Sequence, residues 1–195
     1  MSKKVAMSYP WCNETKLDVL HASGGESKLI FKTANETAEV YLDGADILSV
    51  VCRHGGRKTV IQNHEAHHIV VGEGNAQRDV YHYLKPGGPA PELRLGITKH
   101  RGNGTWSSLP HDFELNPELG FEEVFFYLIA GGNQRAIQVG EGVWHDGSAV
   151  KAAWFVDDHS FSTIPMGYHP VVGEPGVKVH YVWAYLCKKP SWEKI

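Results

Sequence analysis

Long apolar runs are missing from this sequence. No run approaches the ~18 residues that a membrane-spanning helix needs, and the positively charged start is not followed by the apolar stretch of a secretory signal. Cysteine is also scarce, because the three cysteines, Cys12, Cys52 and Cys187, are widely separated and form no C-x-x-C pair. Sparse, unpaired cysteines are typical of a reducing compartment rather than of a disulfide framework. We therefore expect a cytoplasmic protein that does not bind a membrane.

An excess of positive charge is lacking as well. The 195 residues include 19 lysines and arginines against 22 aspartates and glutamates, which gives a formal net charge of -3. This balance provides no electrostatic attraction for nucleic acid or for an anionic membrane surface. The chain does contain 12 histidines, many of them close to carboxylates in the sequence. That combination raises the expectation of a metal site or a proton-transfer site.

Helical periodicity is the third absence. No window of ~12 residues shows an apolar stripe with a 3.6-residue period together with helix start and stop signals. Instead, the 21 glycines and 10 prolines separate short runs rich in β-branched and aromatic residues, such as 28–32, 38–42, 123–129 and 177–184. Many short strands with turn residues between them predict an all-β protein, either a sandwich or a barrel.

The polar, glycine-bearing stretch 72–78 is the expected seam between two parts of the chain. Residues 1–71 are predicted to form an N-terminal β segment, and residues 72–195 a barrel that holds the functional site. The sequence has no internal repeat, low-complexity tract or long linker that would favour another division.

Three dispersed residues in the C-terminal half, His111, Glu123 and His169, have the order expected of a metal site inside a β-barrel. Inward-facing side chains from non-adjacent strands converge at one point in such a barrel. A set of imidazole and carboxylate ligands suits zinc, iron, nickel or manganese and leaves positions for substrate oxygens. Glu123 shares a strand face with Phe125 and Tyr127, so a bound cation would compensate its buried charge. On spacing alone, solvated glutamates at the start of a strand are the alternative.

A second metal pattern is present but set aside. His64-Glu65-Ala66-His67-His68 satisfies H-E-x-x-H, which requires a helix so that both histidines face one side. A strand-like run at 69–71 follows at once, and we therefore interpret the match as coincidental.

Five segments between residues 72 and 186 form an ordered set of motifs. They are Gly72-Glu73-Gly74-Asn75 with Arg78, Gly102-Asn103-Gly104-Thr105-Trp106-Ser107-Ser108, Glu122-Glu123-Val124-Phe125-Phe126-Tyr127, Ala136-Ile137-Gln138, and Pro165-Met166-Gly167-Tyr168-His169-Pro170-Val171-Val172 before Pro175-Gly176. In content and order they resemble the 5-deoxy-glucuronate isomerase family of inositol catabolism, which is related to the 4-deoxy-5-threo-hexosulose-uronate ketol-isomerases. The resemblance implies a cupin (jelly-roll) β-barrel in the C-terminal part, preceded by a partial sheet that is a shortened first cupin.

The resemblance also implies a metal-dependent aldose-ketose isomerase that acts on a deoxy sugar acid through an enediol. Glu123 and His169 match metal positions of the family, with zinc as the first choice and nickel, manganese or iron as alternatives. The family has two metal-binding histidines after Trp-Ser-Ser, whereas this chain has only His111 there. Met166 stands where the family commonly has an arginine, which removes one candidate for binding a uronate carboxylate.

Proton transfer or substrate positioning would need further side chains near the metal. The candidates are Tyr168, Glu122, Gln138, Arg135 and Tyr181. Two other functions stay open, namely a different metal-dependent cupin enzyme such as a dioxygenase, and a cupin that binds a sugar acid without catalysis. A homodimer is expected because cupins commonly pair and because the strand edges of a shortened sheet need cover.

Overall fold

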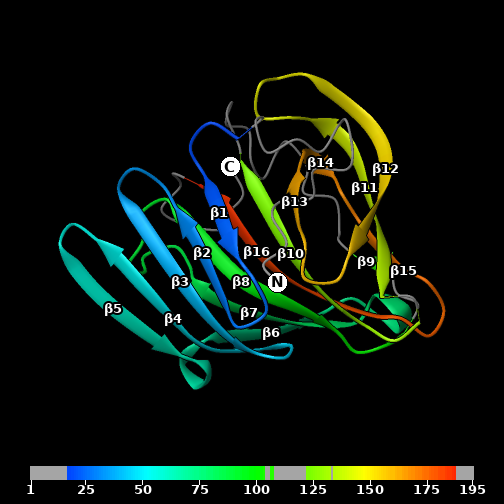
Figure 1. Ribbon diagram of the computed structural model, residues 1–195, viewed down its shortest axis with the longest axis horizontal. Helices are drawn as coiled ribbons and strands as arrows, with labels where there is room; N and C mark the ends of the chain where they lie inside the picture. The colour runs from blue at the N-terminus through cyan, green and yellow to red at the C-terminus, as the bar shows by residue number, and fades with distance from the viewer. Residues whose placement is uncertain (1–16, 104–105, 108–121, 133, 188–195) are drawn as a thin grey trace.

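The computed structural model describes residues 17–103, 106–107, 122–132 and 134–187. Its strands form three antiparallel sheets (Figure 1). No described residue is α-helical, and the described part of the chain lacks any helix with the length and hydropathy that crossing a membrane requires. The prediction of an all-β protein is therefore confirmed.

The first sheet is built entirely from the N-terminal part of the chain. Its strands follow sequence order and are β1 His21–Gly24, β2 Lys28–Lys32, β3 Glu36–Asp43, β4 Asp46–His54 and β5 Arg57–Gln62. The chain leaves this sheet through a short 3-10 turn, η2 Asn63–Glu65. His67 and His68 then begin the next strand, so the H-E-x-x-H residues share no helix face, as expected.

The central sheet draws its strands from both halves of the sequence. In spatial order they are β13 Phe161–Ile164, β10 Glu123–Ala130, β16 Lys178–Leu186, β8 Leu93–His100, β7 Arg78–Leu84 and β6 His67–Val71. A 3-10 turn, η3 Gly74–Ala76, joins β6 to β7. The third sheet contains β12 Ala149–Asp157, β11 Arg135–Val143, β15 Val171–Gly173 and β9 Trp106–Ser107, with β14 Met166–Tyr168 paired to β11.

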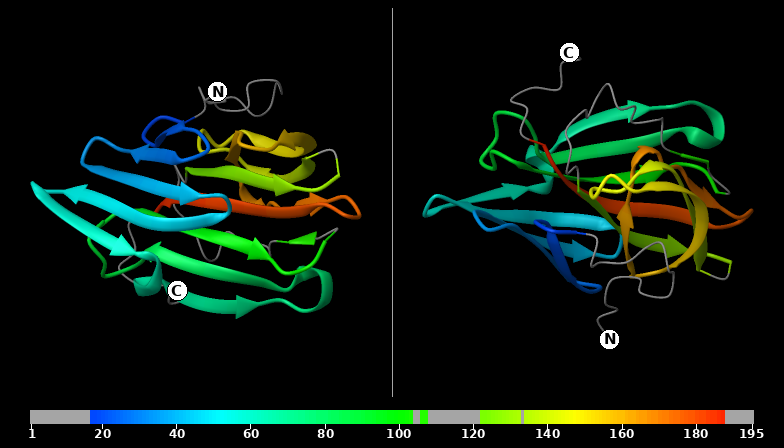
Figure 2. Two further views of the ribbon diagram at one scale, coloured as in Figure 1. Left: turned by 60° about the horizontal axis from the view of Figure 1, so that its bottom comes forward. Right: turned by 90° about the horizontal axis from the view of Figure 1, so that it is seen from above.

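Strand β10 of the central sheet is buried on both of its faces. Val124 and Phe126 belong to the core shared with the first sheet, whereas Phe125 and Tyr127 belong to the core shared with the third sheet. Successive side chains of a strand point to opposite faces, so a strand covered on both sides is apolar almost throughout. The first and third sheets accordingly form two separate groups of strands in Figure 2. Each fully buried apolar side chain contributes about 1.5–3 kcal/mol of transfer free energy.

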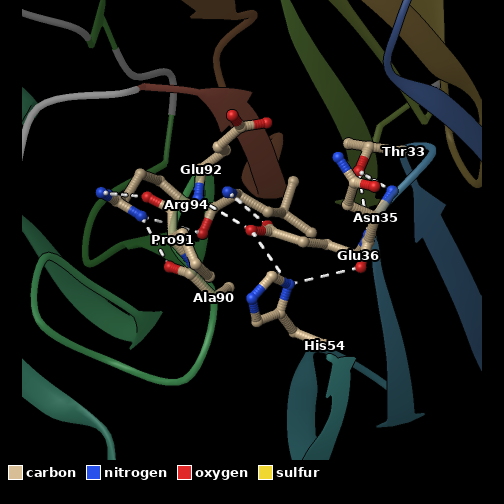
Figure 3. A network of polar contacts seen from close by, with 9 residues as sticks. Thr33, Asn35, Glu36, His54, Ala90, Pro91, Glu92 and Arg94 are labelled. Atoms are coloured by element: carbon tan, nitrogen blue, oxygen red, sulfur yellow. Dashed lines mark hydrogen bonds and ion pairs between the residues drawn. The ribbon is translucent and has the colours of Figure 1, made fainter. Parts of the chain in front are cut away.

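A buried carboxylate connects the first sheet to the central one (Figure 3). Glu36, which is 2% exposed, accepts hydrogen bonds from the backbone N–H groups of Glu92 at 2.9 Å and Leu93 at 2.7 Å. The Thr33 hydroxyl oxygen accepts the N–H of Glu36 itself at 3.0 Å. These bonds satisfy backbone donors at the start of β8 that would otherwise be buried without an acceptor.

Glu122 also connects the two sheets, but here the carboxylate comes from the side of the central sheet and the backbone donors come from the segment before the first sheet. This residue precedes β10 and is 2% exposed. Its carboxylate accepts the backbone N–H groups of Asp18 at 2.9 Å, Val19 at 2.9 and 3.0 Å, and Leu20 at 2.6 Å. Glu122 therefore anchors the segment that leads into the first sheet to the first residues of the central one.

Two adjacent histidines, His100 buried and His180 half-buried, predict a loss of stability in acid. The backbone N–H of His100 on β8 donates to Nδ1 of His180 on β16 at 3.1 Å, so protonation of that nitrogen would break the bond. Burial lowers the pKa of each imidazole to about 4, from a usual value of 6.5. Because the unfolded chain binds these protons more readily, the stabilisation is complete above pH 6.5 and is lost as the pH falls toward 4.

We expect the urea midpoint of unfolding, measured at constant ionic strength, to fall between pH 7 and pH 4.5. The fall should be shallower in His180→Gln, whose side-chain oxygen can still accept the bond from His100. A wild-type midpoint that does not change over this range would contradict the prediction.

Candidate functional site

Glu123 and His169 meet in the core between the central and third sheets. Glu123 is the first residue of β10, and His169 lies in the short connection between β14 and β15. Oε2 of Glu123 is 3.6 Å from Nε2 of His169, and the two side chains are 5% and 0% exposed. The structure thus brings together two of the three predicted metal ligands. The third, His111, lies outside the described residues.

Glycine pairing brings the His169 segment close to β11. Gly167 has a φ of +114°, and it pairs with Gly142 across the two strands. A Cβ atom on Gly142 would lie 1.8 Å from the carbonyl oxygen of Met166, and one on Gly167 would lie 2.6 Å from that of Glu141. Only glycine at both positions permits this approach. The Gly-Tyr-His-Pro motif therefore has a structural cause, which is the placement of His169.

Gln138 holds the backbone of the same connection. Its side-chain N–H groups donate to the carbonyl oxygens of His169 at 2.7 Å and Pro170 at 3.2 Å. Its side-chain oxygen accepts the Tyr127 hydroxyl at 2.7 Å. Gln138 is fully buried, so these bonds satisfy an amide that could not reach water. These bonds fix the backbone of the connection that carries His169.

The electrostatics of Glu123 suit a bound cation. Burial raises the pKa of its carboxyl group to about 8. Within the described chain, Oε2 of Glu123 receives no hydrogen bond. A buried carboxylate oxygen beside an imidazole nitrogen is an O,N donor pair of the kind that divalent metals bind. The cation would stabilise the ionised form and release the proton. The residues present therefore fit the metal that the family resemblance implies.

Glu123 also borders a cavity of about 220 Å³ on the inner face of the central sheet. Four aromatic side chains form its wall, namely Phe125, Tyr181, Trp183 and Tyr185. The rings of Phe125 and Tyr181 are stacked with centroids 4.3 Å apart. Flat aromatic faces of this kind can cover the apolar side of a sugar and exclude water from it.

The structure separates the five residues predicted for proton transfer or positioning. Tyr181 lines the cavity, and Gln138 donates a hydrogen bond to the backbone carbonyl oxygen of His169. Glu122 binds backbone N–H groups instead, and Tyr168 is half-buried outside the residues that line the cavity. Arg135 is exposed at the start of β11, where its guanidinium lies 5.3 Å from the centroid of the Phe155 ring.

Three polar residues of the cavity were absent from the sequence-based prediction of the site. Arg78 and His82 come from β7, and Thr98 comes from β8. Burial lowers the pKa of His82 to about 4, so its imidazole is neutral at pH 7. The sequence did contain one indication of these residues. Arg78 belongs to the motif Gly72-Glu73-Gly74-Asn75 with Arg78, and Arg78, Val80 and His82 are every second residue, so they share one face of a strand.

A second group of potential metal ligands lies apart from this cavity. Ligand atoms of Asp18, Glu122 and His145 lie within 4.8 Å of one another. Nε2 of His145 is 3.4 Å from an Asp18 carboxylate oxygen. The Glu122 carboxylate in this group already accepts the backbone N–H groups described above. This triad is a possible metal-binding group, and none of its members borders the aromatic cavity.

Antiparallel sheets that enclose a glutamate-histidine pair and an aromatic cavity define this chain as a cupin-like protein. Its fold is similar to that of an IolB-like protein from Salmonella typhimurium LT2, with a TM-score of 0.60 and 20% identity over 92% of this chain and 76% of that one. The family model described as the KduI/IolB family matches residues 10–195. The chain therefore belongs to the KduI/IolB family, which confirms the resemblance found in the sequence.

Curated relatives match a shorter region. The chain is 29% identical over 126 residues to the 5-deoxy-glucuronate isomerase of Halalkalibacterium halodurans, a match that covers 63% of this chain and 46% of the relative. It is 27% identical over 126 residues to the enzyme of the same name from Bacillus subtilis subsp. natto, covering 63% of this chain and 45% of the relative. These matches span less than half the length of the relatives.

Proposed function

We propose that this chain is a metal-dependent aldose-ketose isomerase that acts on a deoxy sugar acid similar to 5-deoxy-glucuronate. Family membership and the names of the curated relatives support the reaction class. The observation that carries the proposal is the position of Glu123, which is buried beside His169 at the edge of the aromatic cavity. A purely structural glutamate would leave this buried oxygen without a donor from the described residues, at a cost of about 1–3 kcal/mol.

The reaction moves one proton between neighbouring carbons and one between neighbouring oxygens, so it needs no redox cofactor. A divalent metal held by Glu123 and His169 supplies Lewis-acid stabilisation of the oxyanion charge that develops during the transfer. His111, outside the described residues, is the predicted third ligand. Zinc is the first choice of metal, with nickel, manganese and iron as alternatives.

The other residues of the cavity bind the substrate and exchange protons. The stacked rings of Phe125 and Tyr181 hold the carbon chain and exclude water. The Tyr181 hydroxyl is the predicted proton shuttle that reaches the cavity. His82, which burial keeps neutral, is a second group that can accept a proton there. Gln138 keeps the His169 backbone in place while these transfers occur.

The direct test is to incubate the protein with zinc and 5-deoxy-glucuronate and to follow the ketose by carbon-13 NMR. We expect turnover that a chelator abolishes and that added zinc, nickel or manganese restores, because structural binding alone would not respond in this way. Full turnover after complete metal removal would contradict the metal-dependent mechanism. No conversion at full metal occupancy would contradict the isomerase.

A non-catalytic sugar-acid-binding cupin is the second candidate. The missing family histidine and Met166 in the place of an arginine favour it, since both remove groups that bind ligands in the family. The same NMR samples distinguish the two functions. Saturable binding of 5-deoxy-glucuronate without any ketose would support the binding protein.

A further inference from the structure

Arg78 is a buried cation at the aromatic cavity. It is the first residue of β7, is 6% exposed and lines the aromatic cavity. Nη1 of Arg78 donates to the carbonyl oxygen of Ala76 at 2.8 Å. No carboxylate of the described residues forms an ion pair with Arg78. A guanidinium carries five N–H donors, so a single carbonyl oxygen leaves most of its hydrogen-bonding capacity unused.

Two other arginines show that this arrangement is unusual within the molecule. Arg101, close by at the surface, forms an ion pair with Asp79 through Nε at 2.8 Å. Arg94 is buried like Arg78, but it donates to the carbonyl oxygens of Ala90 at 3.0 Å and Pro91 at 3.0 Å and does not line the cavity. Of these three arginines, the one that lines the cavity makes the fewest hydrogen bonds to the protein, a single bond to a neutral carbonyl oxygen.

The turn between β6 and β7 is shaped around this guanidinium. Gly72 has a φ of +74°, and a Cβ atom there would lie 2.8 Å from Nη1 of Arg78 and 2.3 Å from the carbonyl oxygen of Ala76. Any other residue at this position would push the arginine out of place. Gly72 and the carbonyl oxygen of Ala76 therefore hold the Arg78 guanidinium in a buried position, although an unpaired charge is costly to bury.

The charges that face the cavity favour an anionic ligand. Among the described lining residues, Glu123 carries the one carboxyl group, and the proposed metal would use it. His82 is neutral because of its burial, so Arg78 is the fixed positive charge of this surface. A ligand carboxylate would supply the missing anion and accept two parallel N–H bonds from the guanidinium.

We propose that Arg78 binds the carboxylate of the substrate and thereby selects a sugar acid over a neutral sugar. The proposal rests on the proposed function and names the specificity-determining residue of that site. Arg78 approaches from the central sheet, whereas Met166, in the family's arginine position, belongs to the third sheet. In this chain, the arginine proposed to bind the substrate carboxylate therefore lies on a different sheet from the family's arginine position.

The test compares D-glucuronate with D-glucuronamide, which has nearly the same shape but no charge. Binding to the zinc-loaded protein is measured by calorimetry for wild type, Arg78→Gln and Arg78→Met. We expect wild type to prefer glucuronate by about tenfold to a hundredfold, the range of one charge-assisted contact. Both variants should lose this preference and bind glucuronamide as wild type does. Arg101→Gln removes a surface charge nearby and should keep the preference.

Arg78→Met is included because an apolar side chain in place of a buried charge is often tolerated by the fold. A folded Gln or Met variant that still prefers glucuronate as strongly as wild type overturns the proposal. The assay does not depend on turnover. Arg78-dependent binding without isomerisation supports this inference and contradicts the proposed function, whereas turnover of 5-deoxy-glucuronate with an unchanged KM in Arg78→Met contradicts this inference alone.

Discussion

Glu123→Gln is expected to lower kcat by about a hundredfold or more, the usual effect of removing one group that stabilises the developing charge. The same variant should unfold at a higher temperature than wild type when both are metal-free. Burial raises the pKa of the Glu123 carboxyl group to about 8, so the fold pays a free-energy cost to keep this acid in the core. A neutral amide of the same shape avoids that cost.

Three measurements check this prediction. They are turnover by NMR, bound zinc by elemental analysis, and the unfolding temperature of the metal-free proteins by calorimetry. A gain of one or two kcal/mol would raise the unfolding temperature by about 2–8 °C for a chain of this size. A variant that keeps both its metal and its activity would remove Glu123 from the site.

Glu122→Ala should have the opposite outcome, although the two glutamates are neighbours. It leaves the N–H groups of Asp18, Val19 and Leu20 without their acceptor, and the loss at the buried N–H of Leu20 alone costs about 1–3 kcal/mol. We expect the unfolding temperature to fall by about 10 °C. Turnover per folded molecule should stay at the wild-type value, because Glu122 does not border the cavity.

Glu122→Gln serves as the matched control for this second prediction. One side-chain oxygen remains to accept backbone N–H groups, so its stability should lie between those of wild type and the alanine variant. A folded Glu122→Ala protein that has lost turnover would contradict the structural role. It would instead support the proton-transfer role that the sequence suggested for this residue.

The two glutamates also show how far the sequence alone could define the site. Strand alternation predicts that the adjacent Glu122 and Glu123, at the start of β10, point to opposite faces, and the motif match singles out Glu123. The sequence does not reveal what lies opposite each face. Only the folded chain shows that residues 18–20 reach the Glu122 carboxylate, more than a hundred positions away along the chain.

The three-sheet arrangement had a signal in the sequence as well. The run Val124-Phe125-Phe126-Tyr127 is apolar without interruption, which is typical of a strand covered on both faces. The predicted seam at 72–78, however, separates Arg78 from the N-terminal segment. In the structure, Arg78 pairs with Val71 across β6 and β7, so both sides of that stretch contribute to the cavity. No local pattern shows that this hairpin joins β8, β16 and β10 in one sheet, because β16 is distant in the sequence.

The double burial of β10 has a consequence for how this strand can vary during evolution. Substitutions at Val124 or Phe126 act on the core shared with the first sheet, and so on how much folded protein a cell retains. Substitutions at Glu123 or Phe125 act on the cavity, and so on which molecules the protein recognises. Natural selection therefore acts on abundance and on specificity at alternating positions of a single strand.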